Sequence, residues 1–190
     1  MREQLITATE SAIRAIDASR FFKTERGFHG RFYCALQTEL DRFGLIADGA
    51  ILEMEYQKSA RHGLIQRPDI IFHVPTEHSG FGVVANNFAV WALKRHATNF
   101  EAIEDFNKLD QMFDTLRYPL GFFINIDSTQ PMLEHYTGQH RDRLVALAAC
   151  IDGSAVKIHR VPLGYEAYPS AQLDPPSAPP STPSLKRPRS

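Results

Sequence analysis

The 190-residue sequence lacks the features that are typical of membrane-spanning, secreted and disulfide-rich proteins. No apolar run approaches the roughly 20 residues of a membrane-spanning helix, and the first residues are not the apolar core of a signal peptide. There are only two cysteines, Cys34 and Cys150, each in an apolar segment that reads as helix. We therefore expect a cytoplasmic protein with two buried, reduced thiols, no disulfide and no membrane contact.

A strong excess of charge of one sign is also missing. Lys and Arg together number 21 and Asp and Glu 22, so the formal net charge is −1. The protein has no overall basic charge that would indicate a nucleic-acid partner, although a local basic groove is compatible with this net charge. The sequence contains no phosphate-binding glycine loop, no dinucleotide fingerprint and no nucleophile elbow. Its eight histidines show no zinc-type spacing with cysteine.

The sequence contains enough apolar segments with helical or alternating spacing to form one domain. Hydrophobic residues make up 43% of the chain, a normal fraction for a globular domain with a real core. Helical periodicity predicts helices over residues 3–18, 25–43, 100–116 and 141–151. Short apolar or alternating runs predict strands over 51–56, 69–74, 83–94 (most clearly from 88), 122–126 and 155–161. The glycines within 76–82 indicate a hairpin connection.

This order of elements predicts an α/β fold with a central mixed sheet of about five strands between two layers of helices, a three-layer α-β-α arrangement. The domain is expected to span residues 1–165. Pro, Ser and Ala dominate residues 166–190, so we expect a disordered tail. In the helix over 100–116, one face is apolar, and the opposite face is expected to be solvated. That solvated face carries Glu101, Glu104, Asp105 and Lys108.

Two predicted strands carry the residues on which a functional interpretation depends. The first opens with Arg67, Pro68 and Asp69, and the second ends at Lys94. A carboxylate and a lysine on adjacent strands are a known way to hold a divalent metal ion and activate a water. Alternation along the second strand places Ala92 on the same face as Lys94. An alanine therefore stands where a second carboxylate would be expected.

Together with Glu25 on the preceding helix, these residues resemble the PD-(D/E)XK nuclease superfamily, the fold of restriction endonucleases and archaeal Holliday-junction resolvases. The resemblance covers roughly residues 25–127. It implies a restriction-endonuclease-like fold and Mg²⁺-dependent (or Mn²⁺-dependent) hydrolysis of phosphodiester bonds in DNA or RNA. By position, the resemblance implies that Asp69 binds the metal. It also implies that Lys94 orients or activates the attacking water and that Glu25 adds a metal or water contact.

Ala92 departs from the family pattern, and two interpretations follow from it. Some proteins with this fold place the second acid on a neighbouring element, and here Glu55 and Glu104 are the first candidates for a metal ligand. Other acids close in sequence are Glu53, Glu101 and Asp105. Without such a substitute, the chain would be a catalytically inactive protein of the same fold that binds nucleic acid or another protein.

Basic residues flank the predicted site. Arg61, Arg67 and Arg95 are candidates for contacts with the phosphates of DNA or RNA, the expected partner. Each site residue also has a structural interpretation. Asp69 can cap a turn into a strand, Glu25 can complement a helix N-terminus, and a basic strand end can simply face solvent. The sequence leaves open whether the chain assembles with a second copy of itself or with a partner protein.

Overall fold

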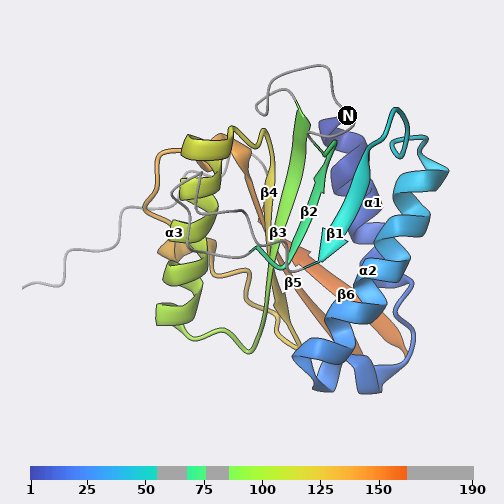
Figure 1. The fold of residues 1–190 in the computed structure, drawn as a ribbon. Coiled ribbons are helices and arrows are strands. Elements are labelled where there is room, and N and C mark those ends of the chain that lie inside the picture. Colours follow the sequence, from blue (N-terminus) through green and yellow to red (C-terminus); the bar gives the residue numbers. More distant parts are fainter. Residues whose placement is uncertain (55–67, 76–85, 162–190) are drawn as a thin grey trace, which may run out of the picture.

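The computed structural model describes residues 1–54, 68–75 and 86–161 (Figure 1). Its helices are α1 (Arg2–Arg14), α2 (Glu25–Arg42) and α3 (Asn99–Leu116). Its strands are β1 (Ile51–Met54), β2 (Ile70–His73), β3 (Asn87–Arg95), β4 (Gly121–Ile126), β5 (Leu144–Asp152) and β6 (Ala155–Arg160). Three short 3₁₀ helices, η1 (Ser19–Lys23), η5 (Leu133–His135) and η6 (Arg141–Arg143), lie in the connections. Arg61 and Arg67, the predicted hairpin connection and the predicted tail lie outside the described residues.

All six strands of the described part form one mixed sheet in the order β1-β2-β3-β4-β5-β6. The first three run antiparallel to one another, β3, β4 and β5 are parallel, and β6 returns antiparallel to β5. Helix α3 makes the crossover between the parallel strands β3 and β4. The prediction of an α/β fold with a mixed sheet is therefore confirmed, with six strands rather than about five.

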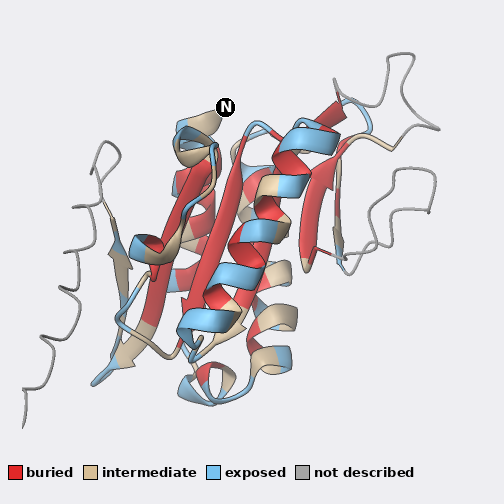
Figure 2. Ribbon diagram, turned by 90° about the vertical axis from the view of Figure 1, so that its left-hand side faces the viewer, coloured by how far each residue is buried: buried red, intermediate tan, exposed pale blue. Residues whose placement is uncertain are grey.

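Helices cover both faces of this sheet. Helices α1 and α2 lie on one face and α3 on the other, so that Figure 1 shows three layers. Side chains alternate between the two cores along β3: Trp91 and Leu93 pack under α1 and α2, whereas Val90 and Ala92 pack under α3. Figure 2 shows that α3 buries one side against the sheet and exposes the other. Within the described ranges, no helix is long and apolar enough to cross a membrane.

The predicted helix over 141–151 is wrong, because this segment supplies strand β5. It pairs with β4 on one side and β6 on the other, and residues 144–149 are buried. A strand covered on both faces is apolar at consecutive positions, so it lacks the alternation that distinguishes a strand from a buried helix. The alanines of this segment favour helix when taken alone. Pairing with two neighbouring strands overrides that preference.

The two cysteines also differ from their prediction. Cys34 is exposed on α2, and Cys150 is half-buried on β5, so neither is a buried thiol in a helix. Both cysteines are free, as expected.

Side-chain caps hold the first turns of two helices. The Thr24 hydroxyl accepts a hydrogen bond from the Gly27 N–H at 3.2 Å, which confirms the predicted start of α2. At the start of α3, Thr98 and Glu101 form a reciprocal capping box. This second cap sets where α3 begins and therefore which of its residues face β3.

A buried hydrogen bond joins α1 to the centre of the sheet. The Trp91 indole Nε1 donates to the Thr9 hydroxyl at 3.1 Å, and both residues are fully buried. The indole also stacks on Phe122 of β4, with ring centroids 5.1 Å apart and planes 4° from parallel. Because the indole has no water to donate to, Thr9 is its acceptor inside the core.

We expect Thr9→Val to lower the free energy of unfolding by about 1–3 kcal/mol, because it leaves a buried indole N–H without an acceptor. Chemical denaturation measures this loss. Thr7→Val is the matched control, since Thr7 is exposed on the same helix and its change should stay within about 0.5 kcal/mol. Equal effects of the two substitutions would contradict a role of this bond in stability.

Candidate functional site

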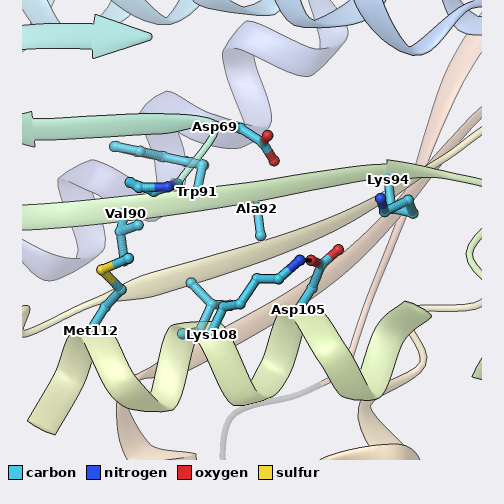
Figure 3. A pocket seen from close by; sticks show the side chains of 10 residues that line it. Asp69, Val90, Trp91, Ala92, Lys94, Asp105, Lys108 and Met112 are labelled. Carbon is cyan, nitrogen blue, oxygen red and sulfur yellow. Dashed lines mark hydrogen bonds and ion pairs between the residues drawn. The ribbon is translucent and has the colours of Figure 1, made fainter. Parts of the chain in front are cut away.

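A small pocket of about 80 Å³ lies where the start of β2, the later part of β3 and the middle of α3 meet (Figure 3). Its lining includes Asp69 from the residue before β2, Lys94 from β3 and Asp105 from α3. Ala92 and Lys108 also line it. Asp69 and Lys94, which the sequence analysis singled out, therefore border the same pocket. Ala92 and Lys94 lie on one face of β3, as alternation predicts.

Asp69 is held by the backbone of β3. Strand β2 pairs with β3 only as far as Trp91, so among the described residues the next stretch of β3 has no strand partner on that side. The Asp69 carboxylate fills this position, and its Oδ2 accepts a hydrogen bond from the Leu93 N–H at 2.7 Å. In a strand the N–H and C=O of one residue point to the same edge. The Leu93 carbonyl is therefore directed to the edge on which Asp69 lies.

Glu25 holds the same edge of β3 two residues further along. Its Oε2 accepts a hydrogen bond from the Arg95 N–H at 3.1 Å. The capped first turn of α2 brings the carboxylate to this point, because Glu25 is the first residue after Thr24. Two acids from separate elements thus take the place of a neighbouring strand.

The surroundings of Asp69 disfavour its negative charge. Burial raises the pKa of this carboxyl most, the hydrogen bond from Leu93 and the nearby His29 oppose that rise, and the negative charges of Asp105 and Glu25 add to it. The net result is a pKa above the ordinary value for an aspartate. A half-buried carboxyl whose charge is opposed by other acids marks a candidate functional site.

Asp105 and Lys108 are the site residues that the sequence analysis assigned to a solvated face. That prediction is wrong for Asp105, whose side chain is only 8% exposed. Asp105 Oδ1 accepts from Lys108 Nζ at 2.7 Å, one helical turn away. Figure 3 shows both side chains directed toward Ala92, whose methyl group leaves room for them.

A signal for Asp105 does exist in the sequence. Ala102, Asp105, Leu109 and Met112 follow one another at spacings of three, four and three, and all four are buried in α3. An acid within such a stripe belongs to the buried face by periodicity. The position of Asp105 in this stripe outweighs its polarity.

Of the two acids predicted as further metal ligands, the structure describes only Glu104. Glu104 is exposed on α3 and is not among the lining residues. Glu55 lies outside the described residues, as do the predicted phosphate contacts Arg61 and Arg67. Across the described ranges, no group of three His, Cys, Asp or Glu side chains is arranged to hold a metal ion.

Arg95 is engaged within the protein. Its guanidinium Nε donates to the Phe22 carbonyl at 3.0 Å, and its second terminal nitrogen donates to Asp127 Oδ2 at 2.9 Å. Lys23 and His96 also lie beside Asp127, at 3.6 and 3.1 Å. These contacts tie η1 to the ends of β3 and β4. They form a basic cluster of Lys23, Arg95 and His96 around one carboxylate.

The basic cluster changes the pKa of Asp127. Burial acts to raise its pKa, but the hydrogen bond from Arg95 and the charges of Lys23 and His96 outweigh that effect. The pKa of Asp127 therefore lies below its ordinary value.

The chain matched no protein-family model, no curated protein and no solved structure with which it was compared. Its function is therefore inferred from the sequence resemblance and from the pocket.

We expect Asp127→Asn to lower the free energy of unfolding at pH 7 by about 1–2 kcal/mol, because it removes a charged acceptor of an arginine hydrogen bond. Asn suits the positive φ of 57° at this position, so the substitution isolates the charge. Because the folded pKa is lowered, the stabilisation is complete above the ordinary carboxyl pKa and is lost as the pH falls through the folded value. The difference from wild type should therefore shrink below about pH 4.

Denaturation at a series of pH values measures this dependence. Asp48→Asn is the control, because Asp48 is exposed and has a similar φ of 54°. A difference between Asp127→Asn and wild type that stays constant down to pH 2 would contradict the electrostatic origin.

Proposed function

We propose that the protein is a metal-dependent nuclease of the PD-(D/E)XK type, with a restriction-endonuclease-like fold, which hydrolyses phosphodiester bonds of DNA or RNA in the cytoplasm. The observation that carries the proposal is that Asp69, Lys94 and Asp105 line a single pocket. Asp69 and Lys94 come from the start of one strand and the end of the next, as the sequence resemblance implies, and Asp105 comes from the helix that follows.

The oxygen atoms around the pocket suit Mg²⁺ or Mn²⁺. Asp69 and Asp105 would hold the ion, and the Leu93 carbonyl points to the edge of β3 that Asp69 occupies. Mg²⁺ prefers oxygen ligands and retains several waters, so one or two carboxylates can suffice. When bound, the ion would supply charge stabilisation at the phosphate and lower the pKa of a bound water.

In this proposal Asp105 is the second acid, in place of Glu55 or Glu104. Ala92, at the position of the missing carboxylate, is the residue toward which Asp105 extends from α3. Asp105 is buried and borders the pocket, whereas Glu104 is exposed one residue earlier on the same helix. A carboxylate from α3 would thus occupy the space that a carboxylate at position 92 of β3 would otherwise fill.

Lys94 and Glu25 have different roles in the proposed reaction. Lys94 lies at the pocket, and its ammonium has no ion-pair partner within 4.0 Å among the described residues. Its charge is thus available to orient the attacking water or to contact the phosphate. Glu25 is a positioning residue: its bond to the Arg95 N–H holds the end of β3, and therefore Lys94, in place.

We expect Asp69→Asn, Asp105→Asn and Lys94→Met each to lower the cleavage rate by about 100-fold or more, a usual loss for a group that acts in a hydrolytic step. The measurement is cleavage of linear duplex DNA, branched DNA, single-stranded DNA and RNA with Mg²⁺ or Mn²⁺. Glu104→Gln is the matched control, because it removes one acid from the exposed face of the same helix and should leave the rate near that of wild type. Cleavage that survives both Asp69→Asn and Lys94→Met would refute the assignment.

A second candidate is a catalytically inactive module of the same fold that binds nucleic acid. Two observations favour this candidate. Ala92 stands at the position of the second carboxylate, and Asp105 already forms an ion pair with Lys108. The basic cluster of Lys23, Arg95 and His96 around Asp127, at the end of β3, would then contact phosphates.

For this second candidate, Lys23→Ala is the informative substitution, because the Lys23 side chain is 66% exposed. It should weaken binding of fluorescent oligonucleotides about equally for all sequences, and it should reduce the slope of log affinity against log salt by about 1. Fluorescence anisotropy in the presence of EDTA measures both effects. Binding unchanged by Lys23→Ala would exclude this surface as the phosphate contact.

A further inference from the structure

Lys108 brings a positive charge to the proposed metal pocket from within the chain. Helix α3 places it one turn after Asp105, and Nζ lies 2.7 Å from Asp105 Oδ1. Figure 3 shows the ammonium directed from α3 toward Ala92. The lysine side chain is 36% exposed, whereas that of its partner Asp105 is 8% exposed.

The electrostatic surroundings of Lys108 are acidic on more than one side. Burial acts to lower its pKa, but the hydrogen bond to Asp105 and the charges of Asp105, Glu104 and Asp69 outweigh it and raise the pKa. Asp69 reaches the pocket from the sheet, and Glu104 and Asp105 come from α3 itself. The ammonium is therefore the internal counter-charge of the two carboxylates that line the pocket.

We propose that Lys108 is a built-in counterion that occupies the cation position of this pocket and must leave it when a divalent metal ion binds. This inference rests on the proposed function, because it takes the pocket between Asp69 and Asp105 as the metal site. It assigns to Lys108 the control of metal affinity, which neither the sequence resemblance nor the predicted ligand set contains.

Three physical features support a displaceable counterion. A divalent ion and an ammonium on the same carboxylate repel each other, so both cannot occupy the position next to Asp105 Oδ1. The lysine stem is long and flexible, and more than a third of the side chain already reaches solvent, so the charged end can turn outward at little cost. Asp105 is buried at the pocket and stays behind as a ligand.

The counterion also has a role when no metal is bound. Without it, Asp105 would be a buried carboxylate without an ion-pair partner among the described residues, and its unpaired negative charge would act on Asp69. Burying an unpaired charge destabilises a fold strongly. Lys108 thus allows the acids of the site to be present before the metal arrives, and it lowers metal affinity as a consequence.

The test is a calorimetric titration of the full chain with Mn²⁺ alone, comparing wild type with Lys108→Met. Methionine keeps most of the aliphatic stem and removes the ammonium. We expect Lys108→Met to bind Mn²⁺ about tenfold more tightly, within the usual range for coupling between two sites. Its melting temperature should rise more with Mn²⁺ than that of wild type, because a ligand that binds the folded state more tightly stabilises it more.

Two control variants separate charge from other causes. Lys157→Met removes one lysine that pairs with Asp152 at the exposed β5–β6 turn, far in sequence from the pocket, and it should bind Mn²⁺ as wild type does. Lys108→Arg keeps the positive charge and should also stay close to wild type. Circular dichroism verifies that each variant is folded. Equal Mn²⁺ affinity of Lys108→Met and wild type would overturn the inference, as would a tenfold gain in Lys108→Arg.

The cleavage assay separates this inference from the proposed function. If wild type cleaves and Asp69→Asn does not, while Lys108→Met gains no affinity, the nuclease function stands and the counterion role is refuted. If no substrate is cleaved but Lys108→Met gains about tenfold in Mn²⁺ affinity, the counterion role stands and the nuclease function is refuted. Absence of Mn²⁺ binding by both wild type and Lys108→Met refutes the counterion role.

Discussion

The candidate site depends on one constraint: the backbone N–H groups at the end of β3 need hydrogen-bond acceptors. The pairing of β2 with β3 stops at Trp91, yet β3 continues to Arg95, so the N–H groups on this edge need other acceptors. Two carboxylates provide them: Asp69 bonds to Leu93 and Glu25 bonds to Arg95. Satisfying the backbone therefore concentrates acidic oxygens at one point of the sheet. A structural need and a capacity to bind cations arise here from the same contacts.

The second acid reaches the site from the opposite layer. The small side chain of Ala92 lets α3 direct Asp105 and Lys108 toward β3, and the ion pair between them balances the charge of the buried acid. The pocket thereby contains two carboxylates and two lysines. Such a balance stabilises the fold without metal, and it means that a divalent ion has to compete with an ammonium for its ligands.

The remaining polar groups near the site are used to join elements. The guanidinium of Arg95 links η1 and Asp127, so the end of β3 is connected to η1 and to the end of β4. Further back along the same strand, the bond between Trp91 and Thr9 joins β3 to α1. Strand β3 is therefore held at its edge, at its end and through its buried face. This explains how Lys94 can be presented at a defined position.

The sequence by itself determined the elements whose patterns are local. The start of α2 after Thr24, the alternation that puts Ala92 and Lys94 on one face, and the order of elements as far as β4 all follow from near neighbours in the chain. Only the tertiary structure decided that residues 144–152 are a strand, because burial on both faces removes the alternation that marks one. It also decided that Asp69, Lys94 and Asp105 border one pocket. Periodicity places Asp105 on the buried face of α3, but the pocket exists only where β2, β3 and α3 pack together.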